Sequence, residues 1–143
     1  MGQFGASASP LDAAIIALAN IADGSEKDAL LKLLARLNAE MEFSHFRAVC
    51  QFLIKNPCPE AVPFLTGLLQ DPQIAGSVES SFEQIIERST PDPNENMQRT
   101  CQLKELYLLK ALQSCDPECG FAAGRLAECE DGPVWLYAGF ARM

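Results

Sequence analysis

The stretch LLKALQSCDPECGFAAGRLAEC, from Leu108 to Cys129, places two apolar segments on either side of Asp116-Pro117. Proline lacks an N–H and disfavours helical geometry in the residue before it, so this dipeptide predicts a break between two helices. Upstream of the break, leucines cover more than one face of a helix, at positions 103, 106, 108, 109 and 112. We therefore expect a central helix over about residues 96–114 and a shorter one over about 118–129.

Comparable breaks divide the rest of the chain into further helices. The expected helices span 10–22, a segment beginning at Ser25, 42–55, 59–70, 74–88 or 77–88, and 134–142, the last a helix or helical fragment. Apolar residues recur at helical spacing at Leu30, Leu33, Leu34 and Leu37, and at Phe43, Phe46, Val49, Cys50 and Leu53. Ser25, with Asp28 three residues later, is a capping-box variant that predicts Ser25 as an N-cap. No segment alternates apolar and polar residues convincingly, so the predicted fold class is all-α, with seven or eight helices.

The breaks also recur at a nearly constant spacing. Asp23-Gly24, Asp71-Pro72 and Asp116-Pro117 are separated by about 45–48 residues, close to the repeat length of HEAT and armadillo units. The segment PEAVPFLTGLLQDP, from Pro59 to Pro72, resembles the first helix and the turn of a HEAT repeat. That resemblance implies a right-handed α-α superhelix, in which stacked helix pairs share one core. The alternative is an irregular all-α bundle.

A second resemblance involves EFSHFRAVCQFL, residues Glu42 to Leu53, and LKELYLLKAL, residues Leu103 to Leu112. Both are similar to parts of the helical C-terminal region attached to some large bacterial FAD-dependent oxidoreductases. This resemblance implies that the chain is an excised accessory domain of such an enzyme. The sequence contains no flavin-binding G-x-G-x-x-G motif, so no cofactor site carries over, and we expect no cofactor.

Length and charge limit the partners and the location. With 143 residues, we expect a single domain over 10–143, preceded by a flexible N-terminal segment over 1–9. The net charge of −8 argues against nucleic acid and anionic membranes as partners, because both are bound by basic surfaces. No window of eighteen apolar residues and no signal-peptide pattern occur, so the expected location is cytoplasmic.

Six cysteines and one histidine are the residues with the most reactive side chains. Most of the cysteines fall among apolar neighbours, so we interpret them as reduced, largely buried thiols, with at least one disulfide as the alternative. The spacing of Cys115, Cys119 and Cys129 matches no standard zinc or iron–sulfur motif, so no metal site is predicted. His45, between two phenylalanines, is typical of a half-buried residue bonded to backbone. No residue is predicted to be catalytic.

The candidate interaction surface has an acidic part and an aromatic part. Glu79, Glu83 and Glu87 are spaced four residues apart and form an acidic stripe on one helix face. This stripe is either a solvated face or a docking surface for a basic partner. Trp135, Tyr137 and Phe140 lie near the C-terminus. They either cap the preceding helices or form an apolar edge that meets another domain or subunit.

Three functions are consistent with these residues. The first is a non-catalytic helical-repeat scaffold that binds a protein or a neighbouring domain, and it requires no catalytic residues. The second is the accessory domain of a larger oxidoreductase. The third is a small enzyme that uses His45 or a cysteine. We expect the chain on its own not to be an enzyme, and the oligomeric state is left open.

Overall fold

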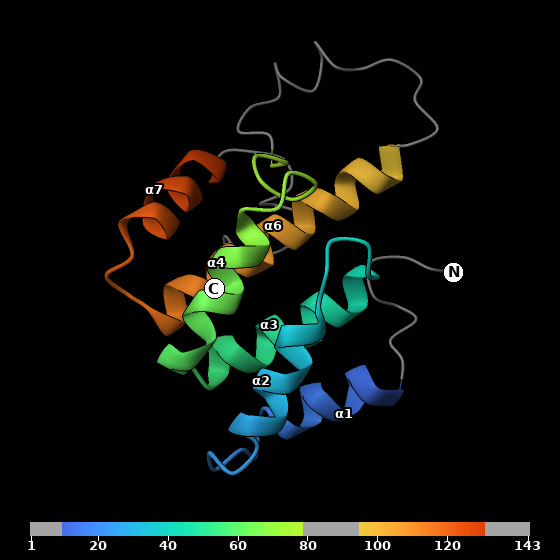
Figure 1. Ribbon diagram of the computed structural model, residues 1–143, viewed down its shortest axis with the longest axis vertical. Coiled ribbons are helices and arrows are strands. Elements are labelled where there is room, and N and C mark those ends of the chain that lie inside the picture. Colours follow the sequence, from blue (N-terminus) through green and yellow to red (C-terminus); the bar gives the residue numbers. More distant parts are fainter. Residues whose placement is uncertain (1–9, 79–94, 131–143) are drawn as a thin grey trace.

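The computed structural model describes residues 10–78 and 95–130, and the side chains in these ranges except those of 95–99. These residues form six α-helices, one short 3-10 helix and no strand, so the predicted all-α class is confirmed (Figure 1). The elements are α1 (Pro10–Leu18), α2 (Lys27–Arg36), α3 (Phe43–Lys55), η1 (Pro59–Ala61), α4 (Val62–Leu69), α6 (Glu95–Cys115) and α7 (Gly120–Cys129).

The core is organised around α6, as its leucine pattern predicts. Helices α3, α4 and α7 pack against α6, while α1 packs on α3 (Figure 1). Every residue from Gln102 to Leu109 is buried, so this part of α6 is enclosed on all sides. The rings of Phe43 on α3 and Tyr107 on α6 meet edge to face, with centroids 5.4 Å apart.

Helices α2 and α3 also bury the predicted faces. All five predicted inward residues of α3 are buried, and Leu30 and Leu34 of α2 are buried with them. Leu33 and Leu37 are partly buried against the same core. The period of 3.6 residues therefore assigns these faces correctly.

Several predicted boundaries are wrong by a few residues. Helix α1 ends at Leu18 instead of residue 22, because Asn20 and Ile21 donate to carbonyls three residues back and tighten the chain into a turn. The predicted 59–70 helix is divided into η1 and α4, with Pro63 in the first turn of α4. No helix begins at Ile74, since residues 71–76 form turns that end at Gly76 with a positive φ of 71°.

The predicted N-cap at Ser25 is also wrong. The backbone N–H of Ser25 donates to Oδ1 of Asp23 at 3.0 Å, which closes a local turn two residues before α2. Glu26 is the N-cap residue of α2, and its side chain makes no capping hydrogen bond. The capping box therefore fails because Asp23 forms a competing bond with the same residue.

Charged side chains inside the core fix the segments around α6. Glu105, only 2% exposed, accepts hydrogen bonds from the N–H groups of Gly76 at 2.8 Å and Val78 at 2.7 Å. Arg125 of α7 lies 3.2 Å from the same carboxylate and also donates to the Val78 carbonyl at 2.8 Å. Glu105 thus joins the end of the 71–78 segment to both α6 and α7.

Lys104 is a second buried charge on α6. Its Nζ donates to the carbonyl of Ala39 at 2.8 Å and lies 5.0 Å from the ring centroid of Phe46. Burial lowers the pKa of this lysine. The contact attaches the connection between α2 and α3 to the central helix.

Candidate functional site

The predicted interaction surface lies outside the described residues. This applies to Glu79, Glu83 and Glu87 and equally to Trp135, Tyr137 and Phe140. The predicted helix over 134–142 and nearly all of the predicted helix ending at 88 are outside them as well. Both parts of that surface therefore remain predictions, and the candidate sites below come from other residues.

The inner face of α1 holds the single charged residue of this helix. Asp12, Ile15 and Ala19 are buried against α3, and Asp12 is 1% exposed. Oδ1 of Asp12 lies 2.8 Å from Nδ1 of His45, near the start of α3. His45 is therefore paired with a carboxylate, where a backbone partner was predicted. The pair lies on the same side of α1 as the buried Ile15 and Ala19.

The outer face of α1 is apolar and exposed. Leu11, Ala14 and Leu18 lie on one side of the helix, and Ile21 follows in the turn after it; we call these four residues the α1 stripe. Leu11 is 53% exposed, Leu18 37% and Ile21 75%. A helix on a protein surface normally turns its polar side to water. Helix α1 does the opposite, since its single carboxylate is inside.

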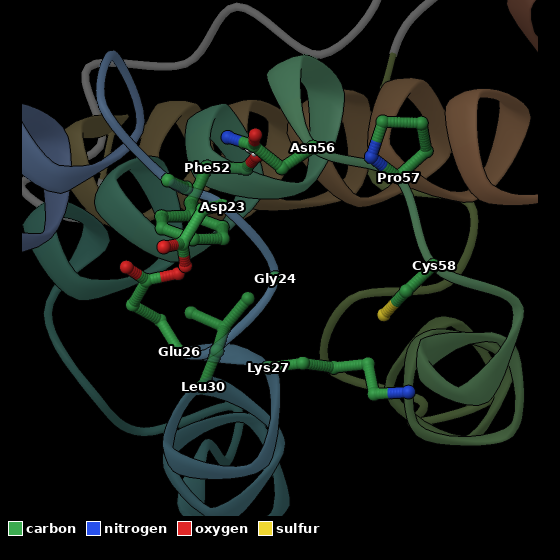
Figure 2. A pocket seen from close by; sticks show the side chains of 10 residues that line it. Asp23, Gly24, Glu26, Lys27, Leu30, Phe52, Asn56, Pro57 and Cys58 are labelled. Atoms are coloured by element: carbon green, nitrogen blue, oxygen red, sulfur yellow. Dashed lines mark hydrogen bonds between the residues drawn. The ribbon is translucent and has the colours of Figure 1, made fainter.

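A cavity of about 400 Å³ lies between the start of α2 and the end of α3 (Figure 2). We call it the α2–α3 cavity. Its apolar walls include Leu30 and Phe52, which are both buried. The residues that line it are Ala22, Asp23, Gly24, Glu26, Lys27, Leu30, Phe52, Asn56, Pro57 and Cys58. The cavity therefore combines apolar walls with ionisable groups.

The charges of the α2–α3 cavity are divided between two sides. In Figure 2 the carboxylates of Asp23 and Glu26 lie toward one side of the view, and the Lys27 ammonium and Cys58 thiol toward the other. Lys27 pairs with Glu60 at 2.5 Å, and this hydrogen bond raises the pKa of Lys27 and lowers that of Glu60. Hydrogen bonds from Ser25 lower the pKa of Asp23.

Glu26 is a half-buried lining residue with one carboxylate oxygen enclosed in the protein. Its Oε2 atom is buried and has no hydrogen-bond partner among the described residues. A buried carboxylate oxygen without a partner is costly, because it has lost hydration and gained nothing in return. Helix α2 begins directly after Glu26, so the helix dipole compensates only part of this cost.

All six cysteines are free thiols. Cys50, Cys58, Cys115 and Cys129 are buried, whereas Cys101 and Cys119 are partly exposed. Burial raises the pKa of Cys50 and Cys115, and it raises that of Cys129 to about 11. Such thiols are poor nucleophiles at neutral pH. Cys58 lines the α2–α3 cavity and His45 does not, so these two residues do not share that site.

Among the described residues, no three His, Cys, Asp or Glu side chains are grouped so that they could hold a metal ion. The important charged residues are instead Asp12, Glu26 and Glu105, none of which was singled out from the sequence. A signal was present for two of them. Asp12 is the lone charge in PLDAAIIAL, and Glu105 lies among the leucines of the central helix, so each needs a buried partner.

Comparisons with protein-family models, with curated proteins and with solved structures found no significant match to this chain. The described helices include none that is both long enough and apolar enough to cross a bilayer. The class that the fold defines is therefore an all-α helical domain, and its function has to be argued from its own surfaces.

Proposed function

We propose that this chain is a non-catalytic interaction module, and that the α1 stripe docks on a partner protein or a neighbouring domain. The observation that carries the proposal is the reversed polarity of α1. Its one charged side chain, Asp12, is buried, while Leu11, Leu18 and Ile21 face solvent. Contiguous exposed apolar residues on a water-soluble fold are typical of an interface.

The spacing of the α1 stripe favours a helix as the contacting element. Leu11, Ala14 and Leu18 are separated by steps of three and four residues, as in a coiled-coil seam, and Ile21 extends the apolar surface into the turn after α1. An amphipathic helix could lay its apolar side along this seam. Because the chain carries a net charge of −8, a partner helix with basic residues beside its apolar face would associate fastest.

The HEAT-like arrangement is a finer part of the same proposal. Tight turns separate α1 from α2 and α6 from α7, as a chain of helix pairs requires. A HEAT unit also pairs its two helices, and here α1 packs mainly on α3 instead of α2. The accessory-domain function would make the partner a neighbouring domain of the same oxidoreductase, and it predicts an apolar contact around Trp135 and Phe140, which lie outside the described residues.

Site-specific photo-crosslinking in cells that produce the full chain tests the proposal. A photoreactive residue replaces Ala14 in the α1 stripe or, as the control, Ala123 on α7; both are exposed helical alanines. We expect a discrete adduct with a second protein from position 14 and none from 123. Mass spectrometry identifies that protein, and the purified pair must bind again. Equal adducts from both positions, or none from 14, would contradict the proposal.

A further inference from the structure

We infer that the α2–α3 cavity binds a small organic cation, namely a primary amine that carries an apolar body. A volume of about 400 Å³ falls within the range of small-molecule sites, roughly 300–1,000 Å³. The site is independent of the α1 stripe, because none of the four stripe residues lines it. Each part of the ligand is assigned by a different group of lining residues.

The ammonium group is assigned by Glu26. Its side chain lines the cavity and is half-buried, and its carboxylate lies close to that of Asp23 on one side of the view in Figure 2. A ligand N⁺–H at this side would make charge-assisted hydrogen bonds, which are strong. Asp23 lines the same cavity, and the hydrogen bonds from Ser25 that lower its pKa keep it ionised at neutral pH.

The protein's own cation does not fill this role. Lys27 follows Glu26 directly, but its Nζ is paired with Glu60 on η1, on the side of the cavity near Cys58 (Figure 2). Asp28 adds a further negative charge beside Lys27. The carboxylates of Asp23 and Glu26 lie on the other side of the cavity from this ammonium, so the local field on their side favours a cationic ligand (Figure 2).

The apolar body is assigned by Leu30 and Phe52. These side chains are 4% and 5% exposed, and both face the cavity. An apolar group in contact with them would lose hydration at little polar cost. A bare metal ion would leave these walls unused, whereas an aryl- or alkyl-ammonium would use both the walls and the carboxylate.

NMR titration of the full chain with 2-phenylethylammonium tests the inference. We expect saturable shifts at Leu30 and Phe52, with a dissociation constant on the order of 1 mM, as suits a small ligand with one charged anchor. 2-Phenylethanol and 3-phenylpropionate have the same aromatic body without the positive charge. We expect each to bind at least about tenfold more weakly.

Glu26→Gln is the decisive variant, with Glu118→Gln in the exposed turn before α7 as the matched control. We expect Glu26→Gln to weaken amine binding about tenfold and Glu118→Gln to leave it unchanged. Glu26→Gln keeps the size of the side chain at a half-buried position, so its midpoint of urea unfolding should stay close to that of the unmodified chain. The inference is overturned if the three ligands bind alike, if the amine gives no saturable shifts, or if Glu26→Gln binds as tightly as the unmodified chain.

Discussion

Oδ1 of Asp12 lies 2.8 Å from Nδ1 of His45, beneath a helix whose outer side is almost entirely apolar. This contact joins residues 33 positions apart and links α1 to α3. A carboxylate that is 1% exposed needs partners, and His45 is one of them. Because Asp12 points inward, Leu11 and Leu18 point outward. The pair and the burial of Ile15 and Ala19 on the same face therefore go together with the exposure of the stripe.

Removing either member of this pair should destabilise the chain. We expect Asp12→Ala and His45→Ala each to lower the free energy of unfolding by about 2–3 kcal/mol, with a coupling of about 1–2 kcal/mol in the double variant. Urea denaturation of all four forms measures the coupling. Asp28→Ala, on exposed α2, should change stability by less than about 0.5 kcal/mol. Additive effects of the two substitutions would show that the pair does not act as a unit.

Glu105 should matter far more than the other carboxylate bound by Arg125. Glu105→Gln replaces a buried carboxylate that accepts two backbone N–H groups and faces Arg125, and we expect a loss of about 2–4 kcal/mol. Glu128 pairs with the same arginine but is 65% exposed, so Glu128→Gln should cost less than about 0.5 kcal/mol. Thermal unfolding of both variants compares them directly. Equal losses would be inconsistent with the described role of Glu105.

Thiol labelling should divide the cysteines into two groups. At pH 8 in the folded chain, Cys101 and Cys119 should react quickly with a thiol reagent, and the four buried cysteines slowly. Mass spectrometry of partly labelled protein identifies the sites. In urea without a reductant, all six should react. Fewer than six would reveal a disulfide, and rapid labelling of Cys50 or Cys129 would contradict their burial.

Cys129 should contribute a loss of stability at alkaline pH. Burial, the main cause, raises its pKa from 9.0 to about 11. The folded chain therefore keeps this proton where the unfolded chain has released it. Its stabilising contribution is complete below pH 9 and disappears as the pH rises to about 11. The contribution of Lys104 to the free energy of unfolding has the opposite dependence on pH. It rises with pH, because burial lowers the pKa of this lysine and the folded chain releases the proton first.

Comparison with Cys129→Ala isolates this contribution from that of Lys104. Urea unfolding at pH 8 and pH 11 should show the unmodified chain losing on the order of 1 kcal/mol more than the variant. The variant will be less stable at both pH 8 and pH 11, because it lacks a buried side chain. The quantity to measure is therefore the change in the free energy of unfolding between the two pH values, compared between the unmodified chain and the variant. Parallel slopes would show that Cys129 keeps an ordinary pKa.

The sequence predicts features of this fold that depend on local patterns. Phe46 and Leu53 repeat at helical spacing on α3, and Asp116-Pro117 marks the end of α6. Such patterns need no knowledge of distant residues. The cap of α2 is missed because Asp23 bonds to Ser25 within three residues, an alternative that the capping pattern does not distinguish.

The candidate sites depend on contacts that are distant in the sequence. Nothing near Asp12 indicates that His45 is its partner, although a lone charge in an apolar segment predicts that it has one. The α2–α3 cavity brings Glu26 and Phe52 together from different helices, and no short motif contains both. Which apolar side of α1 is exposed also depends on how α3 packs against it. These features follow from tertiary packing, and only the structure supplies it.

The most direct test of the central claim is the affinity of the crosslinked partner for two matched variants. Ala14→Glu places a charge in the α1 stripe, and Ala123→Glu places the same charge on an exposed position of α7. We expect Ala14→Glu to weaken binding at least about tenfold, since a charge is then buried in an apolar seam. Ala123→Glu should stay within about twofold of the unmodified chain, with both variants equally folded. If Ala14→Glu binds as tightly as Ala123→Glu, then the α1 stripe is not the docking surface.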